Sequence, residues 1–417
     1  MYHWLRVHFV SSPRIHSTSL KKMETRLPTE ILAIVAQYAS IDTLVQLSVV
    51  SRGVHFVVMP ALYASIPDMN MPRAIQCLRT LLIKPEAARL VRSFVFNLSV
   101  CHALQALRTL LIRVLGNMTG LHTLSLYLWA GPPSILSQMS CRLTKFTCMV
   151  LSNDSFPISQ FLMSQPTIEE LIIMCPSKDI SGLGLDALPV LRQLTAPYWL
   201  LHDLLLPRLS HISQLTVTGI AIDAKKFVHL AEIFKTGKHP RSLELIIGMD
   251  ITNPMVIQAF SLGLALVGLA APFITSLTLN ISLGPIQKEE LQNMFAFALP
   301  RFPNLKTLTV LTPPSTSSEY IHGDSQTRPM QDTISLLHSK LVSVSDTPVD
   351  IFLFFPRPQV EPGQAQSRPN VIPISLYNRS CHLPLLKAWR RVHHGLEYVV
   401  FPEKRYTCTD DEHGSDS

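Results

Sequence analysis

Charged residues are scarce in this chain of 417 residues. Asp, Glu, Lys and Arg together make up 16% of the sequence, whereas apolar residues make up 47%. This composition excludes a wholly disordered chain, because a large hydrophobic core can form. The formal net charge is +7, but the basic residues are scattered and no run of five or six occurs. The sequence therefore lacks the clustered basic surface that nucleic-acid binding requires, and we expect no nucleic-acid partner.

Cysteine is also scarce, and its spacing excludes several classes of site. The seven cysteines form no C-x-x-C pair and their number is odd, so we expect free thiols in a reducing compartment, cytoplasmic or nuclear. The sequence has no Gly-rich phosphate loop and no G-x-S-x-G motif. Its His and Cys residues lack the short paired spacings of zinc sites. We therefore predict that the chain is not an enzyme and binds no metal and no cofactor.

Two segments could be mistaken for targeting or membrane signals. Residues 1–23 contain four basic residues and no acid, and we interpret them as a disordered leader or the product of an upstream start. A mitochondrial presequence is the alternative. Residues 251–287 contain no charge, but their apolar part, 255–271, is shorter than the ~20 residues that span a bilayer. We expect a buried helix there, and a membrane anchor is the alternative.

Residues 24–66 have the pattern of three short helices. Pro28 suits the first turn of the first helix, Asp42 can cap the second, Ser51 can cap the third, and Pro60 is expected to end it. Apolar residues recur within these helices at helical spacing: Ile31, Leu32, Ile34, Val35, Leu44, Leu47, Val54, Val57 and Val58. Three helices over so few residues make a small core, so we expect a partner or a following domain to cover their apolar surface.

These residues resemble the F-box family. The resemblance covers about a tenth of the chain and rests on Leu27-Pro28-x-Glu30-Ile31-Leu32, Asp42, Leu44, Leu47, Val50-Ser51-Arg52 and Leu62-Tyr63. It implies binding to a Skp1-type adaptor of a cullin-based ubiquitin ligase complex. By motif position, it implies that the adaptor is contacted by Leu27, Pro28, Ile31, Leu32, Leu44, Leu47 and Val50. The alternative is that the three helices only cap the domain that follows.

A second pattern recurs from about residue 90. It consists of three apolar residues, with two residues between the first and the second and one residue between the second and the third. Its nine middle residues are Phe94, Leu124, Phe146, Leu171, Leu194, Leu215, Leu243, Leu277 and Leu308. Helix candidates such as Asp223–Thr236 and Gln287–Leu299 lie between these strand candidates. The spacing resembles that of leucine-rich-repeat proteins, with units of ~20–29 residues. It predicts an irregular α/β solenoid with a parallel sheet and with helices on its convex side; an irregular α/β domain of other topology is the alternative.

Polar residues alternate with the apolar residues of these strands. A strand places successive side chains on opposite faces, so these polar side chains should form a row on the open face and contact a protein target. They are Thr123, Ser125, Lys145, Thr147, Gln193, Thr195, Gln214, Thr216, Ser276, Thr278, Thr307 and Thr309. Leucine-rich repeats usually have Asn or Cys five positions after the middle residue. None of the nine units has either residue there, so the row of asparagine side chains that usually joins such repeats, the asparagine ladder, cannot form.

The sequence thus predicts an adaptor protein with two functional parts, the helical module and the solenoid. We expect it to be the substrate-recognition subunit of a Skp1-cullin-F-box type ubiquitin ligase, with an unidentified protein target. The alternatives are an interaction scaffold outside any ubiquitin ligase and a membrane-associated protein anchored by residues 255–271. The predicted segments are a leader at 1–23, an F-box-like module at 24–66, a solenoid at 75–405 with Pro-rich loops at 312–330 and 355–373, and an acidic disordered tail at 406–417.

Overall fold

A computed structural model describes most of the chain in two units. The described residues are 27–98, 105–128, 135–150, 158–218, 224–250, 254–283, 288–312, 376, 379–402 and 404–408. The predicted leader, residues 313–330, residues 355–373 and the tail from residue 409 lie outside these ranges. The two units, 1–191 and 192–417, are each compact, and each is described by itself.

The first unit begins with the three predicted helices: α1 Thr29–Tyr38, α2 Ile41–Ser48 and α3 Arg52–Ala64. Ser51 caps α3 as predicted, since its Oγ accepts a hydrogen bond from the Val54 N–H at 3.2 Å. The prediction that Asp42 caps α2 is wrong. Ser40 takes that place and accepts from the Thr43 N–H at 3.3 Å, and Asp42 lies in the first turn, where a negative charge favours the helix dipole.

Helix α3 runs past Pro60, contrary to the prediction. A proline inside a helix removes one N–H donor and usually ends or kinks the helix. Here Ala61 and Leu62, in the last turn, pack against the core of the three helices, which offsets the missing hydrogen bond. The chain then passes directly into β1, Ser65–Ile66, so the sheet begins within the range predicted for the helical module.

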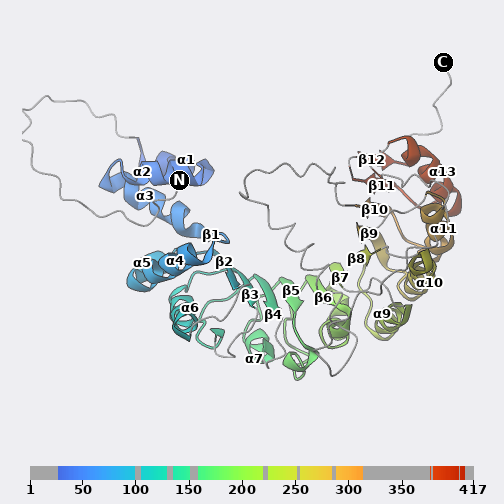
Figure 1. Cartoon of the computed structure of the whole chain (residues 1–417), viewed down its shortest axis with the longest axis horizontal. Helices are drawn as coiled ribbons and strands as arrows, with labels where there is room; N and C mark the ends of the chain where they lie inside the picture. Colours follow the sequence, from blue (N-terminus) through green and yellow to red (C-terminus); the bar gives the residue numbers. More distant parts are fainter. Residues whose placement is uncertain are drawn as a thin grey trace, which may run out of the picture. The chain divides into compact units, whose positions relative to one another are not determined.

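The rest of the first unit is a parallel sheet with helices on one side (Figure 1). Its strands follow one another in chain order, from β1 to β5. After β1 they are β2 Ser93–Leu98, β3 Thr123–Leu128, β4 Lys145–Val150 and β5 Glu170–Met174. The helices are α4 Met71–Ile83, α5 Pro85–Ala88, α6 Gln105–Asn117, α7 Ile158–Met163 and the 3₁₀ turn η2 Ser177–Asp179.

The second unit repeats this construction over more strands. Its parallel strands are β6 Gln193–Pro197, β7 Gln214–Thr218, β8 Leu243–Asp250, β9 Ile274–Leu283, β10 Thr307–Leu311 and β11 Tyr398–Phe401. The strand β12 Lys404–Thr407 pairs antiparallel with β11. The helices are α8 Leu201–Leu205, α9 Ala224–Thr236, α10 Pro254–Ala270, α11 Lys288–Ala298 and α13 His382–Val392. Short 3₁₀ turns are η3 Tyr198–Leu200, η4 Leu209–His211, η5 Leu299–Arg301 and η6 Arg379–Cys381.

The register confirms eight of the nine predicted middle residues. In the first unit the aligned positions are Phe94, Leu124, Phe146 and Leu171. In the second unit they are Leu194, Leu215, Leu245, Leu277 and Leu308. Leu243 was the wrong choice for β8, because both Leu243 and Leu245 are buried and the register shifts just after Leu243.

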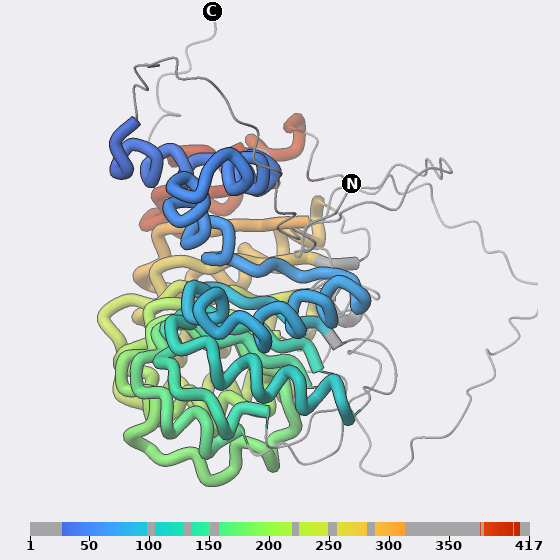
Figure 2. The backbone as a smooth tube through the Cα atoms, turned by 90° about the vertical axis from the view of Figure 1, so that its left-hand side faces the viewer, coloured from blue at the N-terminus to red at the C-terminus, as the bar shows by residue number. Residues whose placement is uncertain are grey.

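The predicted leucine-rich-repeat type of solenoid is therefore confirmed. Within each unit the backbone coils are stacked in chain order (Figure 2). The aligned apolar residues of the strands are buried under the helices, and the alternate positions lie on the opposite, open face.

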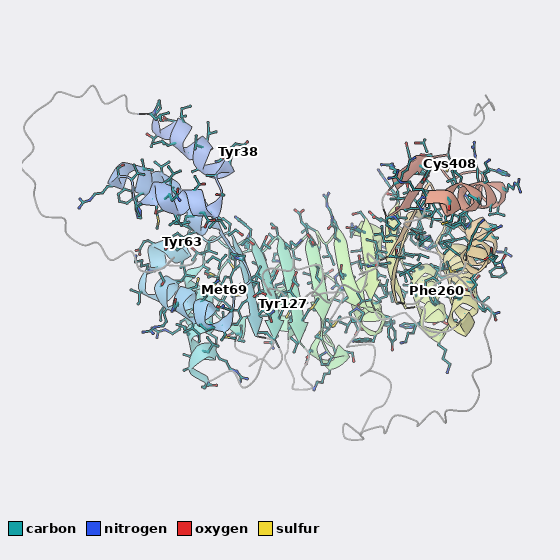
Figure 3. The ribbon with its side chains drawn as sticks, turned by 45° about the horizontal axis from the view of Figure 1, so that its top comes forward. Tyr38, Tyr63, Met69, Tyr127, Phe260 and Cys408 are labelled. Atoms are coloured by element: carbon teal, nitrogen blue, oxygen red, sulfur yellow. The ribbon has the colours of Figure 1, made fainter. Side chains whose placement is uncertain are left out.

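The apolar part of the charge-free segment forms helix α10, which is buried on one side only: Leu264 and Val267 are buried, whereas Leu262 and Leu269 are exposed. Gly263 allows close packing on α9, because a Cβ at this position would lie 2.4 Å from the Phe227 ring. Gly268 does the same beside Phe302, where a Cβ would lie 2.8 Å from the ring. Phe260 of α10 is buried in the same layer (Figure 3). Among the described residues, no helix is both long enough and apolar enough to cross a membrane.

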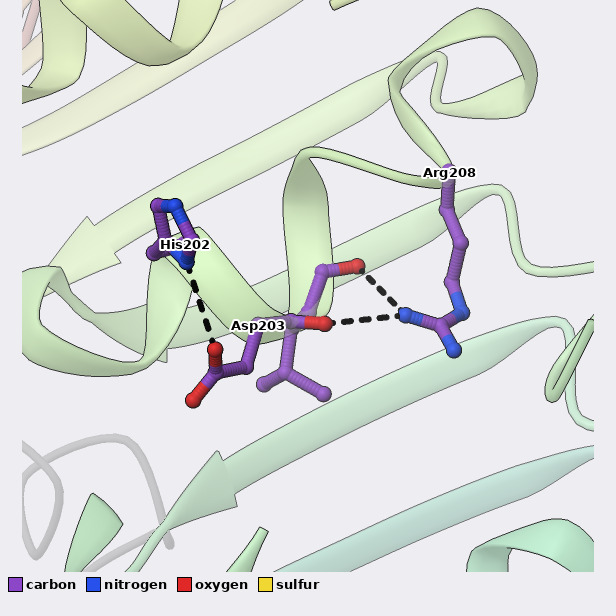
Figure 4. Close-up of polar contacts among 4 residues, drawn as sticks. His202, Asp203 and Arg208 are labelled. Atoms are coloured by element: carbon purple, nitrogen blue, oxygen red, sulfur yellow. Dashed lines mark hydrogen bonds and ion pairs between the residues drawn. The ribbon is translucent and has the colours of Figure 1, made fainter. Parts of the chain in front are cut away.

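Polar side chains, among them the buried Arg208 and His393, tie the irregular turns to the backbone. Arg208 donates from Nη1 to the carbonyls of Asp203 and Leu204, both at 3.1 Å, at the end of α8 (Figure 4). Burial lowers the pKa of Arg208 from its ordinary value. Between neighbouring repeats, Asn304 Nδ2 donates to the Pro272 carbonyl at 2.7 Å, and His393 Nε2 lies 2.7 Å from the Phe302 carbonyl.

Candidate functional site

The first three helices have a small core of their own. Ala36 of α1, Leu44 of α2 and Val58 of α3 are buried against one another. Five partly buried residues surround them: Ala39, Leu47, Val54, Ala61 and Leu62. The three helices therefore form a defined unit of packing, but their core uses only one side of each helix.

The other side of α1 is an exposed apolar stripe. Leu27 is 61% exposed, Ile31 44% and Tyr38 86%, and Ile34 and Val35 are exposed between them. These positions recur at intervals of three and four residues, so they share one face of the helix. Tyr38 lies at the C-terminal end of α1 (Figure 3). A helix on the surface of a globular protein usually carries polar residues on such a face.

A second group of exposed apolar residues lies where α2 meets α3. Val49 and Val50 are exposed at the end of α2, and Phe56 of α3 is 74% exposed. Ile41, at the start of α2, is also exposed. Together with the α1 stripe they form what we call the docking surface: Leu27, Ile31, Ile34, Val35, Tyr38, Ile41, Val49, Val50 and Phe56. So many large apolar side chains on so small a module indicate a protein-binding site.

The predicted adaptor contacts fall into three groups by exposure. Leu27, Pro28, Ile31 and Val50 are exposed, whereas Leu32 and Leu47 are half-buried. Leu44 is only 4% exposed because it is enclosed by α1 and α3, so it supports the docking surface from within and cannot reach a partner.

Sequence reasoning did not assign six residues of the docking surface to the site. Ile34 and Val35 were identified only as part of an apolar helix face, and Tyr38, Ile41, Val49 and Phe56 were not identified at all. The continuation of the i, i+4, i+7 spacing from Leu27 would have found the residues of α1.

Helix α3 joins this module to the sheet without a linker. The Ala64 carbonyl accepts a hydrogen bond from the Arg92 N–H at 2.8 Å, and Ile66 is buried in register with Phe94. Burial is the main cause that raises the pKa of Tyr63 in the last turn of α3. The module and the first strands are therefore held in one packed structure.

The predicted target-binding residues of the first unit align as expected but are largely covered. Thr123 is in register with Lys145, and Ser125 with Thr147. Thr123 and Lys145 are half-buried, whereas Ser125 and Thr147 are buried. Lys145 forms an ion pair with Glu170 of the next strand, at 2.5 Å.

Apolar residues follow this polar row toward the ends of the same strands. Tyr127 is in register with Met149, and Met149 with Met174. Burial, together with the negative charge of Asp68, raises the pKa of Tyr127 to about 12. This part of the open face therefore differs from the uniformly polar surface that the sequence predicted.

The second unit brings its predicted residues into two parallel rows. The first row contains Gln193, Gln214, Ser276 and Thr307, with Glu244 between Gln214 and Ser276. The second row contains Thr195, Thr216, Thr278 and Thr309, with Ile246 between Thr216 and Thr278. Gln193 is exposed, Thr278 is buried and the others are half-buried. Such rows of hydroxyl and amide groups can donate and accept hydrogen bonds, and they carry little charge.

In the part of the chain that the structure describes, no group of three or more His, Cys, Asp and Glu side chains is arranged to hold an ion. Burial raises the pKa of the Cys77 thiol to about 11.

Comparisons with known proteins give a likeness among solved structures. No protein-family model matches the sequence, and no curated protein matches it. The crystal structure of the Rad7 and Elc1 complex in yeast is similar over 73% of this chain and 94% of that chain, with 12% sequence identity and a TM-score of 0.37.

Proposed function

We propose that this chain is the substrate-recognition subunit of a Skp1-cullin-F-box type ubiquitin ligase. In this role the docking surface binds a Skp1-type adaptor, and the open face of the solenoid binds a protein target. The observation that carries the proposal is that the first three helices pack a core of their own and still expose nine large apolar side chains. The F-box-like motif lies on these same helices.

The energetics favour association through this surface. Burial of a large apolar side chain contributes about 1.5–3 kcal/mol. Four or five such side chains of the docking surface would therefore offset much of the entropy lost on association. The central residues Ile31, Val35 and Val50 carry no charge that a partner would have to desolvate.

The joint between α3 and β1 suits a function based on proximity. Because α3 enters the sheet directly, a target bound to the first unit would keep a fixed position relative to an adaptor on the module. A fixed geometry raises the effective concentration of a target lysine near a conjugating enzyme. In this proposal the chain itself catalyses no step.

Direct binding to a purified Skp1-type adaptor tests the proposal. We expect Leu27→Asp with Ile31→Asp to weaken binding at least 100-fold, because two charges would be buried without partners. Ile83→Asp is the matched control, since Ile83 is 74% exposed on α4, outside the docking surface. The control should bind within about threefold of the wild-type chain.

Two results would overturn the assignment. One is a wild-type chain that does not bind the adaptor in titration; the other is a double variant that binds as the wild type does. The first result would favour an interaction scaffold outside any ubiquitin ligase, and the second would show that the docking surface is not where the adaptor binds. Circular dichroism and thermal unfolding of each variant would show that loss of binding is not loss of folding.

A further inference from the structure

The last strand of the second unit leaves one edge of the sheet open. The strand order ends at β12, Lys404–Thr407, which pairs on one side with β11 (Figure 1). Among the described residues no strand lies on the other side of β12. An open edge presents backbone N–H and C=O groups to which an extended segment of another protein can bond as an added strand.

The register of this hairpin determines which backbone groups of β12 point outward. The Cys408 N–H, just after β12, donates to the carbonyl of Glu397, just before β11, at 2.8 Å. In an antiparallel pair, hydrogen-bonded and non-hydrogen-bonded residues alternate. Counting back from Cys408, every second residue bonds to β11, and the N–H and C=O groups of Arg405 and Thr407 point away from it. The open edge therefore offers two donors and two acceptors at the spacing of a strand.

Side chains on the helix side of β12 hold this edge in place. Tyr406 Oη lies 2.9 Å from Nδ1 of the buried His382, and its ring packs edge-on against Phe401, with the ring centroids 5.9 Å apart. His382 is fixed in turn, since its Nε2 lies 2.7 Å from the Leu376 carbonyl. The edge is therefore preorganised, and a partner strand would not have to order it on binding.

Two cations lie along the open edge, one on each face of the strand. Lys404 and Arg405 are exposed neighbours in β12, and successive side chains of a strand point to opposite faces. Arg405 lies 4.1 Å from the centre of the Tyr398 ring, and Lys404 lies 4.8 Å from that of Tyr406. In the described part of the chain, neither cation is paired with a carboxylate. An aromatic ring leaves a cation its full charge, so both can still attract an anion.

These charges decide which kind of strand fits the edge. Pairing with a second copy of the chain would bring Lys404 and Arg405 of both copies onto neighbouring strands, where like charges are destabilising. Two acids at successive positions of an added strand would instead meet one cation on each face of the sheet. Cross-strand pairs of opposite charge stabilise such an arrangement.

We propose that the open edge of β12 is a binding site for an extended acidic segment of a partner protein, which adds to the sheet as a further strand. The backbone of Arg405 and Thr407 supplies hydrogen bonds that do not depend on the partner's side chains, and the side chains of Lys404 and Arg405 select two adjacent acids. This inference does not rest on the proposed ligase function, since β12 belongs to the second unit and the docking surface to the first.

Fluorescence anisotropy with the full-length chain tests the charge preference of the edge. The probe is a short peptide in which Thr and Val alternate on both sides of a central pair of Glu residues, and the comparison peptide has Lys in place of both Glu residues. We expect the wild-type chain to bind the acidic peptide at least tenfold tighter than the basic one. Equal affinity for the two peptides, or no saturable binding of the acidic one, would overturn the proposal.

Charge reversal locates the preference on β12. Lys404→Glu with Arg405→Glu should reverse the order of the two peptides, and a reversal, unlike a simple loss of binding, cannot result from misfolding. Lys238→Glu with Arg241→Glu is the matched control, since both residues are exposed elsewhere in the same unit, and it should keep the wild-type preference. A β12 variant that still prefers the acidic peptide would place the binding site elsewhere.

Backbone methylation of the acidic peptide separates strand addition from attraction by charge alone. In an added strand only every second N–H points to β12. Two acidic peptides are therefore compared, one N-methylated at the odd positions and the other at the even positions. We expect one of them to bind at least tenfold more weakly than the other. Equal affinity of the two methylated peptides would show that no strand is added.

Sedimentation velocity of the same samples tests the edge against a second copy of the chain. We expect the acidic peptide to bind without a change in the state of association of the chain. A dimer that the peptide dissociates would assign the edge to a second copy and overturn its assignment to an acidic partner.

Discussion

Gln165 lies between two repeats of the first unit and bonds the backbone on both sides of Arg142. Its Oε1 accepts from the Leu143 N–H at 3.0 Å, and its Nε2 donates to the Cys141 carbonyl at 3.0 Å. The side chain is buried, so both bonds are shielded from water. Where the standard asparagine ladder is missing, single polar side chains such as this one satisfy the backbone between repeats.

Replacement of Gln165 by Leu should destabilise the first unit by about 2–4 kcal/mol. The substitution leaves one buried N–H and one buried C=O without partners, and each such group costs about 1–3 kcal/mol. Urea unfolding monitored by circular dichroism measures the loss. The control Gln258→Leu, on the exposed side of α10, should change stability by less than about 0.5 kcal/mol. A similar stability for both variants would show that the Gln165 bonds contribute little.

The docking surface and the core beneath it should respond differently to truncation. Val50→Ser with Phe56→Ser removes exposed apolar groups, so we expect adaptor binding to fall at least tenfold with little change in thermal unfolding. Leu44→Ala removes a buried side chain and should cost about 2–5 kcal/mol of stability. Calorimetry and adaptor titration on the same samples distinguish the two effects. A fully stable Leu44→Ala protein would contradict the packing described here.

Two thiols, of the half-buried Cys77 and the buried Cys148, make the first unit sensitive to alkaline pH. Burial raises the pKa of Cys77 to about 11, and burial with the charge of Asp179 raises the pKa of Cys148 to about 12. A raised pKa in the folded state means that the unfolded chain loses these protons first, from about pH 9. The contribution of these protonated thiols to the free energy of unfolding is therefore complete below pH 9. It decreases as pH rises toward 12, by up to about 1.4 kcal/mol per pH unit for each thiol.

Urea titrations at pH 8.0 and pH 10.5 measure this dependence. The variant Cys77→Ala with Cys148→Ala should show a smaller decrease between the two pH values than the wild-type chain, whatever its stability at pH 8.0. An unchanged decrease would assign the alkaline sensitivity to other groups, such as Tyr127, whose pKa is also raised.

The polar rows of the second unit should control target binding without affecting the adaptor. Gln214→Arg with Thr216→Arg places two charges on the open face, where both wild-type side chains are half-buried. We expect targets captured from cells under proteasome inhibition to be lost from this variant while adaptor affinity stays within about threefold. The variant Leu27→Asp with Ile31→Asp should show the reverse pattern. Loss of both partners from either variant would indicate misfolding and would be checked by thermal unfolding.

The local sequence determined the helix ends and the repeats wherever a short pattern was sufficient. Ser51 caps α3 as predicted, because a cap depends on neighbouring residues only. The register of Phe94, Leu124, Phe146 and Leu171 followed from the alternation of apolar and polar residues, which a pleated strand requires.

Only the tertiary structure decided which apolar residues stay exposed. Leu44 and Val50 look alike as parts of one motif, yet Leu44 is enclosed by two helices and Val50 is left at a turn. Pro60 should end a helix by its local chemistry, but packing of Leu62 carries α3 through it. The bonds of Gln165, and the hydrogen bond that the Glu397 N–H donates to the Lys306 carbonyl, join residues far apart in the chain. Periodicity fixes which residues share a face of one element, whereas burial depends on what other elements place against that face.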